Sequence, residues 1–345
     1  AVTAASSASI DALVMALSVS IAGGLGGGAL TGAGDNATNR IQVLVTASVT
    51  GDPIATPRRT VSASSVTVRA TDASRIRANV AAASVGIAGG VVAGAVAVGV
   101  ALAHNDVSGG AQASIVGMVV TATTVRVEAI SAGGSPVAIG TSALDVALTT
   151  AAAQLDGHGT LTAGQVDALR IPLASLGLSR SLAVGVLVAG SSWLLRDLVD
   201  GRSWTIVKTG TGYLLTAPTI DALAIAASAA VSGGVVAVNV AGAGAEASNT
   251  INTQTSATIS SSTVTATTVE VLAASSRGIL ATIVGAALAA GGGVGAASGA
   301  LGVVTARNDI GFTAAGSRAP TTVSALISGS TVTADVITVR ATGAQ

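Results

Sequence analysis

The chain has 345 residues and a formal net charge of zero; half of its residues are hydrophobic, but only 1% are aromatic and 9% are charged. Without a basic stripe or interleaved aromatic residues, the sequence excludes nucleic acid as an expected partner, and without cysteine it can form neither a disulfide nor a thiolate site. A core without large aromatic side chains depends on many small contacts at high packing density, which favours regular stacked structure over an irregular enzyme core.

The first predicted element is a pair of strands joined by a glycine turn. From residue 13 to residue 22, bulky side chains alternate with mostly smaller ones, and this period of two is typical of a β-strand. The glycine cluster at 23–28 predicts a tight turn. The next apolar segment predicts a second strand, which we expect to end in a loop at Asn39.

The same order recurs along the chain, which indicates a repeat protein. A short motif, x-V-[ST]-A-x-x-[VI]-x-V-x-A, occurs at residues 60–70, 119–129, 263–273 and 331–341. An asparagine motif precedes each copy and contains Asn39, Asn105, Asn249 and Asn308. Each unit therefore predicts a strand, a glycine turn, a second strand, an asparagine loop and short coil-forming strands.

Residues 78–103 carry no charge and have two interpretations. Gly86, Gly90 and Gly94 have the four-residue spacing of a glycine-zipper membrane helix, and the run is long enough to span a bilayer. The same run alternates strictly from Val92 onward, with valine and leucine on one face and mainly alanine and glycine on the other. We favour strands, buried on both faces of a layered stack. The alternative is a membrane-embedded glycine-zipper pore or toxin-like protein.

The four asparagines also have two interpretations. They could surround an ion or glycan site, to which Asp106 and Asp309 would add carboxylates in two of the units. Alternatively, each asparagine bonds its own backbone or stacks on its counterpart in the next coil, as ladder positions do in stacked β-structure. We favour the structural role, because only two of the four copies have the aspartate.

Residues 131–218 depart from the repeat and contain a loop that resembles a degenerate EF-hand. In the sequence QLDGHGTLTAGQV, Asp156, His158 and Thr160 take three ligand positions. Glutamines replace the acidic ligands at the first and twelfth positions. Calcium is therefore a weak alternative to a plain glycine-rich loop.

The rest of this segment predicts a helix over about 162–178 and hairpins around the turn signals at 200–201 and 210–212. Three aromatic residues lie in the hairpins, where they could stack on a carbohydrate or fill a small local core: Trp193, Trp204 and Tyr213. We favour the local core.

No pattern in the sequence predicts catalysis, because neither histidine is spaced for a metal site and no nucleophile or phosphate-loop motif is present. We expect no enzyme activity, no catalytic residue and no cofactor. The predicted fold class is all-β: a β-solenoid with long Ala/Gly/Val hairpin strands and a small α+β insertion. The expected domains are solenoid repeats at 1–130, the insertion at 131–218 and further repeats at 219–345.

The short motif resembles the rungs of filamentous-haemagglutinin-like β-helices, and residues 257–273, ATISSSTVTATTVEVLA, carry that pattern almost unbroken. Together with Ala/Gly/Val hairpins that end in asparagine, it resembles the repeat region of very large bacterial surface adhesins of the leukotoxin-type filamentous class. The resemblance implies an extracellular or cell-surface fibrous protein, without known catalytic residues, that acts in attachment or as a structural filament.

The first and last residues of the chain fall at the same phase of the repeat. AVTAASSASI at residue 1 aligns with VRATDASRI at Val68, and VRATGAQ at Val339 begins the same stretch. A solenoid cut at this phase exposes unpaired strand edges. We therefore expect further copies of the chain as end-to-end partners. Host or matrix glycans are a second expected class of partner. We do not expect a membrane as partner.

Overall fold

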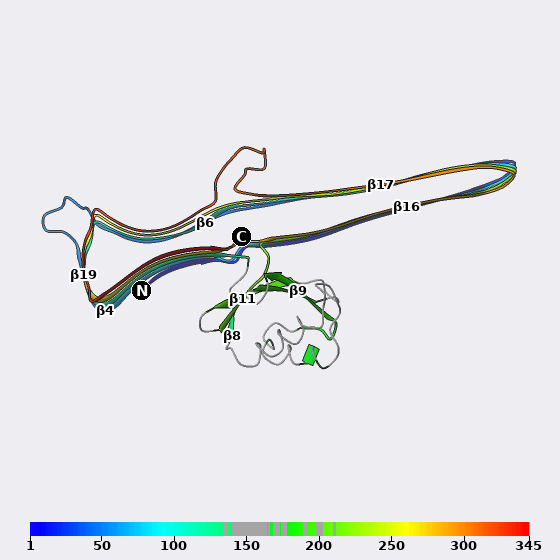
Figure 1. Ribbon diagram of the computed structural model, residues 1–345. Coiled ribbons are helices and arrows are strands. Elements are labelled where there is room, and N and C mark those ends of the chain that lie inside the picture. Colours follow the sequence, from blue (N-terminus) through cyan, green and yellow to red (C-terminus); the bar gives the residue numbers. More distant parts are fainter. Residues whose placement is uncertain are drawn as a thin grey trace.

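The computed structural model describes residues 1–133, 137–139, 164, 166–167, 173, 178–188, 192–197, 203–209 and 212–344. Outside the insertion, strands of successive units lie side by side in parallel sheets. Figure 1 looks along the stack, so that the coils nearly superimpose. The predicted all-β, β-solenoid fold is confirmed.

Each coil passes through three sheets. The outgoing sheet contains β2 (Ser9–Gly23), β5 (Arg75–Gly89), β13 (Ile220–Gly233) and β16 (Ile279–Gly292). The return sheet contains β3 (Gly26–Thr50), β6 (Val92–Val116), β14 (Val236–Ser260), β17 (Gly295–Ile310) and β18 (Thr322–Ser328). The body sheet contains β1 (Val2–Ser6), β4 (Thr60–Asp72), β7 (Val119–Ala132), β15 (Thr263–Ser276), β19 (Thr331–Thr333) and β20 (Val336–Ala344).

The coils form a wide body and a long thin arm (Figure 1). In the body, the second half of each return strand packs over the body sheet around branched aliphatic side chains such as Val45, Ile115, Val127 and Val271. In the arm, the outgoing strand packs against the first half of the return strand, and the core consists of alanines. The short repeated motif forms the body sheet, with its copies in register.

The two layers of the arm approach closely because their facing side chains are small. Ala97 is fully buried between them. A Cβ added at Gly99 would lie 2.6 Å from the carbonyl oxygen of Ala227 in the opposite layer, closer than side-chain atoms come to backbone. At the tip of the arm, Gly90 has a φ of 158°, and an added Cβ would lie 2.2 Å from the Gly24 oxygen in the neighbouring coil. The tip turns therefore depend on glycine.

The prediction that the arm strands are buried on both faces is wrong for this chain. The small face points inward, and the bulky face points outward into the surroundings: Leu13, Met15 and Leu17 are 67%, 71% and 74% exposed. The physical reason is the spacing of the layers, because bulky side chains on the inner face would hold the two backbones farther apart than Gly99 and Ala97 allow.

The helical interpretation of residues 78–103 is wrong, because this run forms part of β5, the tip turn and part of β6. Its strict alternation, and not its glycine spacing, determines the structure. In the described part of the chain, no helix has the length and apolar character required to cross a membrane.

A second correction concerns the asparagines. Asn39 does not lie in a loop but inside the 25-residue strand β3, which continues to Thr50. Its side chain faces the interior and is 8% exposed. The same inward, mid-strand position recurs in β6 and β14.

The insertion leaves the solenoid after β7 and rejoins it at β13. Its described strands form a separate antiparallel sheet of β8 (Val137–Ile139), β12 (Gly212–Thr216), β11 (Ser203–Thr209), β10 (Ser192–Asp197) and β9 (Leu182–Val188), in that order. The two predicted hairpins are confirmed by the pairing of β10 with β11 and of β11 with β12. Within the predicted helix, the described residues Gly164, Val166 and Asp167 have helical backbone.

Candidate functional surfaces

The four asparagines of the repeat form a hydrogen-bonded ladder through the interior of the solenoid. The Nδ2 group of Asn39 donates to Oδ1 of Asn105 at 2.9 Å, and Asn105 donates in the same way to Asn249 at 2.8 Å. Asn249 then donates to Asn308 at 2.8 Å. Each inner amide therefore donates to one coil and accepts from the other, which satisfies polar groups that would otherwise destabilise a buried position.

The ladder has a direction. All three bonds run from the earlier coil to the later one. This leaves the Oδ1 acceptor of Asn39 at one end of the stack and the Nδ2 donor of Asn308 at the other, and within the described residues neither atom has a partner.

A buried ion pair spans the corner at which the insertion leaves. Arg277 forms a hydrogen-bonded ion pair with Asp72 and donates to the backbone oxygen of Ser74 at 3.1 Å. Both charged side chains are almost completely buried. The pair joins the coil before the insertion to the coil after it, past the intervening corner at Gly133. Burial lowers the pKa of Arg277, and the charge and hydrogen bond of Asp72 oppose that shift.

Charged side chains on the outer face of the body sheet pair within β7 and with the neighbouring strands β4 and β15. Arg126 bonds Glu128 at 2.9 Å and approaches Glu270 at 3.3 Å, and Arg69 approaches Glu128 at 3.3 Å. The hydrogen bond to Glu128 is the main reason why the pKa of Arg126 is raised. Exposed pairs of this kind each contribute about 0–1 kcal/mol. Their effect is to match opposite charges between neighbouring coils.

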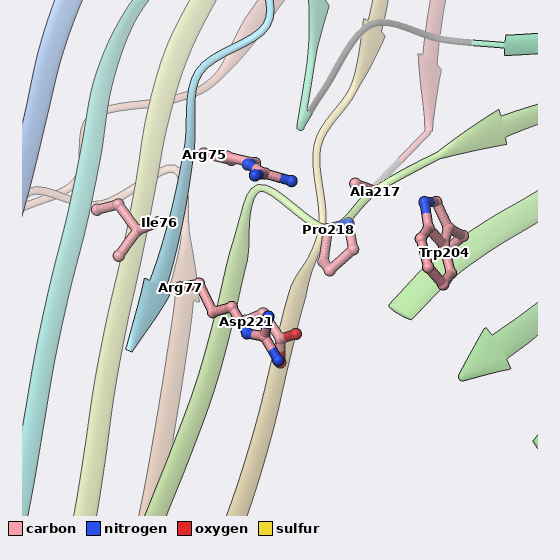
Figure 2. Close-up of a pocket in the computed structure, with 7 residues that line it drawn as sticks. All are labelled: Arg75, Ile76, Arg77, Trp204, Ala217, Pro218 and Asp221. Atoms are coloured by element: carbon pink, nitrogen blue, oxygen red, sulfur yellow. The ribbon is translucent and has the colours of Figure 1, made fainter. Parts of the chain in front are cut away.

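A small pocket lies where the insertion meets the base of the arm. Figure 2 shows Arg77 and Asp221, which are register partners on adjacent strands, beside Pro218 and Trp204 of the insertion. The pocket volume is about 50 Å³, enough for one or two water molecules. This volume is far below that of a typical small-molecule site.

A shallow groove follows the sharp bend of the body sheet. Two rows of mainly hydroxyl side chains flank a row of alanines, and the rows run along the stack from coil to coil. One row contains Ser62, Thr121, Thr265 and Thr333. The other contains Thr123, Thr267 and Asp335. Hydroxyl side chains can exchange hydrogen bonds with sugar hydroxyls, and the glycan partner expected from the sequence stays a prediction.

The aromatic residues singled out in the sequence lie in the insertion. Trp193 and Trp204 are 4% and 8% exposed and belong to the insertion's core, with Leu195, Ile206 and Leu215. Tyr213 lies in β12, where its backbone pairs with Lys208 and Ile139. The buried indoles fill a local core and do not form a stacking surface.

The calcium prediction remains untested, because Asp156, His158 and Thr160 lie outside the described residues. Among the residues that are described, no group of three or more histidine, aspartate or glutamate side chains is placed to hold a metal ion. Sequence reasoning missed the buried pair of Arg277 and Asp72, for which no local signal exists. It also missed the direction of the asparagine ladder.

Comparison with protein-family models, with curated proteins and with solved structures gives no match.

Proposed function

We propose that the chain is a structural, non-catalytic part of an extracellular or cell-surface bacterial filament or adhesin, whose β-coils stack end to end. The resemblance of the short motif to filamentous adhesin repeats supports the location and the class of protein. The parallel solenoid, with its coils in register, supports the stacking.

The direction of the asparagine ladder carries the proposal. An acceptor on Asn39 at one end and a donor on Asn308 at the other are complementary, so a second copy in the same orientation continues the ladder with an identical bond. The strand edges agree with this orientation. β2 and β3 are the first strands of their sheets, and β16 and β17 lie at the opposite edges. Such open edges pair readily with strands of another copy.

The body sheet adds a geometric condition. Residues 2–6 occupy the same register columns as the last strand, because one column contains Val2, Val68, Val127, Val271 and Val339. When β2 of one copy pairs with β16 of another, β1 of the first copy falls at the position of β20 in the second. One of these two strands must move aside. Removal of residues 1–6 is therefore expected to favour assembly.

Electron microscopy and sedimentation of the purified chain test the proposal. We expect filaments that lengthen when residues 1–6 are removed. The variant Asn308→Asp keeps an oxygen that accepts from Asn249 but loses the donor toward the next copy, so the association constant is expected to fall about tenfold or more. Asn36→Asp, on the exposed outer face of β3, adds the same charge as a control.

A discrete monomer at all concentrations, with or without residues 1–6, would show that the chain does not polymerise. Equal assembly of the Asn308→Asp and Asn36→Asp variants would show that the ladder does not guide it. Immunogold labelling of the cells that produce the protein tests its location, and signal confined to the interior of the cells would contradict the surface assignment.

A further inference from the structure

The arm carries its large apolar side chains on both outer faces. On the outgoing layer these include Leu13, Met15 and Leu17, and on the return layer Val238, Val240 and Leu301, all of which are about half exposed or more. Figure 1 shows the arm projecting well away from the body, so that the body does not cover its outer half. A monomeric protein in water rarely exposes an apolar surface of this extent.

The tip of the arm is apolar as well. The residue after the turn glycine in each coil is a leucine or valine, and these four residues hold equivalent positions at the tip, between strands that are in register: Leu25, Val91, Val235 and Val294. Leu25 is 85% exposed and Val294 is 96% exposed.

The interior of the arm is small and partly polar. Ser84, Ser228 and Asn239 are buried between the layers, and the hydroxyl groups of Ser18 and Thr31 share a hydrogen bond of 2.6 Å across them. The large apolar side chains therefore face outward, while the inner face carries mainly alanine with a few polar groups. In a water-soluble sandwich the large apolar side chains face inward, whereas strands that contact lipid turn them outward.

Charged residues return at the base of the arm in every coil. They flank the four hairpins as the pairs Asp11 and Asp35, Arg77 and Asp106, Asp221 and Glu246, and Arg277 and Arg307. In the third hairpin, residues 222–245 contain no charge, which leaves 12 residues in β13 and 10 in β14, on either side of the two-residue turn. At about 3.3 Å per residue, the layers extend about 33–40 Å. A bilayer has a hydrocarbon core of about 30 Å and a total thickness of about 40–45 Å.

We propose that the arms enter a lipid bilayer tip first, and that this is how the stacked coils attach to a surface. A protein partner that covers one face would leave the other face and the tip exposed, whereas a bilayer covers both faces and the tip together. The sequence led us to expect no membrane partner, because the strict alternation in residues 78–103 favours strands over a membrane helix. The insertion and the charged residues at the base then lie at the level of the lipid headgroups.

The open edges of the arm set a requirement. Within each layer the coils satisfy one another's backbone groups, but the outer edges of the first and last coils have no partner strand in the described chain. Unpaired backbone groups are not tolerated in hydrocarbon. The inference therefore rests on the proposed end-to-end stacking, which pairs these edges between copies.

A single engineered cysteine tests insertion directly, because the chain has none of its own. Val294→Cys at the tip, labelled with an environment-sensitive dye, is mixed with neutral phosphatidylcholine vesicles after filaments have formed. We expect a blue shift of the emission, quenching by lipids that carry a quencher in the acyl chains, and flotation with the vesicles that persists at high salt. Thr46→Cys, exposed on the return strand over the body, is expected to show none of these changes.

A pair of matched variants tests the faces of the arm. Leu17→Lys places a charge on the arm, and Leu44→Lys places it on an exposed leucine over the body. A lysine in the bilayer core is costly. We therefore expect Leu17→Lys to reduce vesicle binding about tenfold or more, and Leu44→Lys to leave it unchanged.

The outcomes separate this inference from the proposed function. Filaments that form but neither float nor shift the dye at residue 294 would overturn the inference and leave the stacking intact. A dye shift that is complete before vesicles are added would show that second copies of the chain cover the arm, and would also overturn it. If no filaments form, the proposed stacking fails, and the inference fails with it, because the outer edges of the arm then have no partner strand in hydrocarbon.

Discussion

Gly99 lies where the backbone of the opposite layer of the arm is very near, and Gly99→Ala adds one methyl group at that point. The added Cβ would lie 2.6 Å from the carbonyl oxygen and 3.3 Å from the carbonyl carbon of Ala227. Both are backbone atoms, so no side chain can rotate away. To restore a normal contact, the layers must separate locally by about 0.8 Å. Because protein interiors are close-packed, overpacking of this kind costs about 1–3 kcal/mol.

The matched control is Gly244→Ala, on the return strand of the adjacent coil. Gly244 lies one register position farther along than the partner of Gly99, and an added Cβ there meets no atom within 4 Å. Because glycine loses more backbone entropy than alanine on folding, this substitution is expected to leave stability unchanged or raise it by up to about 1 kcal/mol. The same chemical change is therefore expected to lower stability at residue 99 and to leave it unchanged or raise it at residue 244.

Hydrogen exchange measured by mass spectrometry on arm peptides, such as residues 78–89, is the suitable assay because stability in a repeat protein is local. The expected cost corresponds to exchange that is about 5- to 150-fold faster in the arm of Gly99→Ala, with little change in the body. If Gly99→Ala and Gly244→Ala exchange at the same rate, the close approach of the layers does not limit the arm, and the explanation of the small inner face is wrong.

Three further predictions concern the solenoid. Asn105→Ala leaves an unpaired donor and an unpaired acceptor in the ladder, and we expect it to lower the free energy of unfolding by about 1–3 kcal/mol in urea titrations, whereas Asn36→Ala on the outer face changes it little. Arg277→Ala leaves Asp72 buried without its partner and is expected to cost about 3–5 kcal/mol, while serine at both positions, which removes both charges, restores much of the loss. Deletion of residues 134–218 is expected to leave the far-ultraviolet circular dichroism of the solenoid and its resistance to protease intact, and a largely unfolded product would contradict this.

The alternation of large and small side chains predicted the strands, but it could not predict which face points inward. The usual expectation is that leucine and methionine face a core. In the arm the opposite holds, because Gly99 and Ala97 allow the backbones to approach so closely that bulky side chains have no room between them. The spacing of the layers depends on how two strands pack together, so the sequence of one strand alone cannot predict which face points inward.

The position of the asparagines shows the same limit. Asparagine is typical of loops and turns, so a loop was predicted at Asn39. In a stack of parallel coils, however, identical side chains lie next to one another, and an amide can donate to one copy and accept from the next. The pair of Arg277 and Asp72 could not be predicted at all, because its members are 205 residues apart and meet only where the insertion interrupts one corner.

The insertion leaves the solenoid at the corner at Gly133 without changing the register of the coils on either side. An added Cβ at Gly133 would lie 2.5 Å from the backbone nitrogen of Thr219, so the chain leaves and re-enters at nearly the same point. Strands on either side keep their register across this interruption. A folded module can therefore be exchanged for another, or omitted, without any adjustment in neighbouring coils. Such a scaffold can diversify what it displays at its corners while its repeating architecture stays constant.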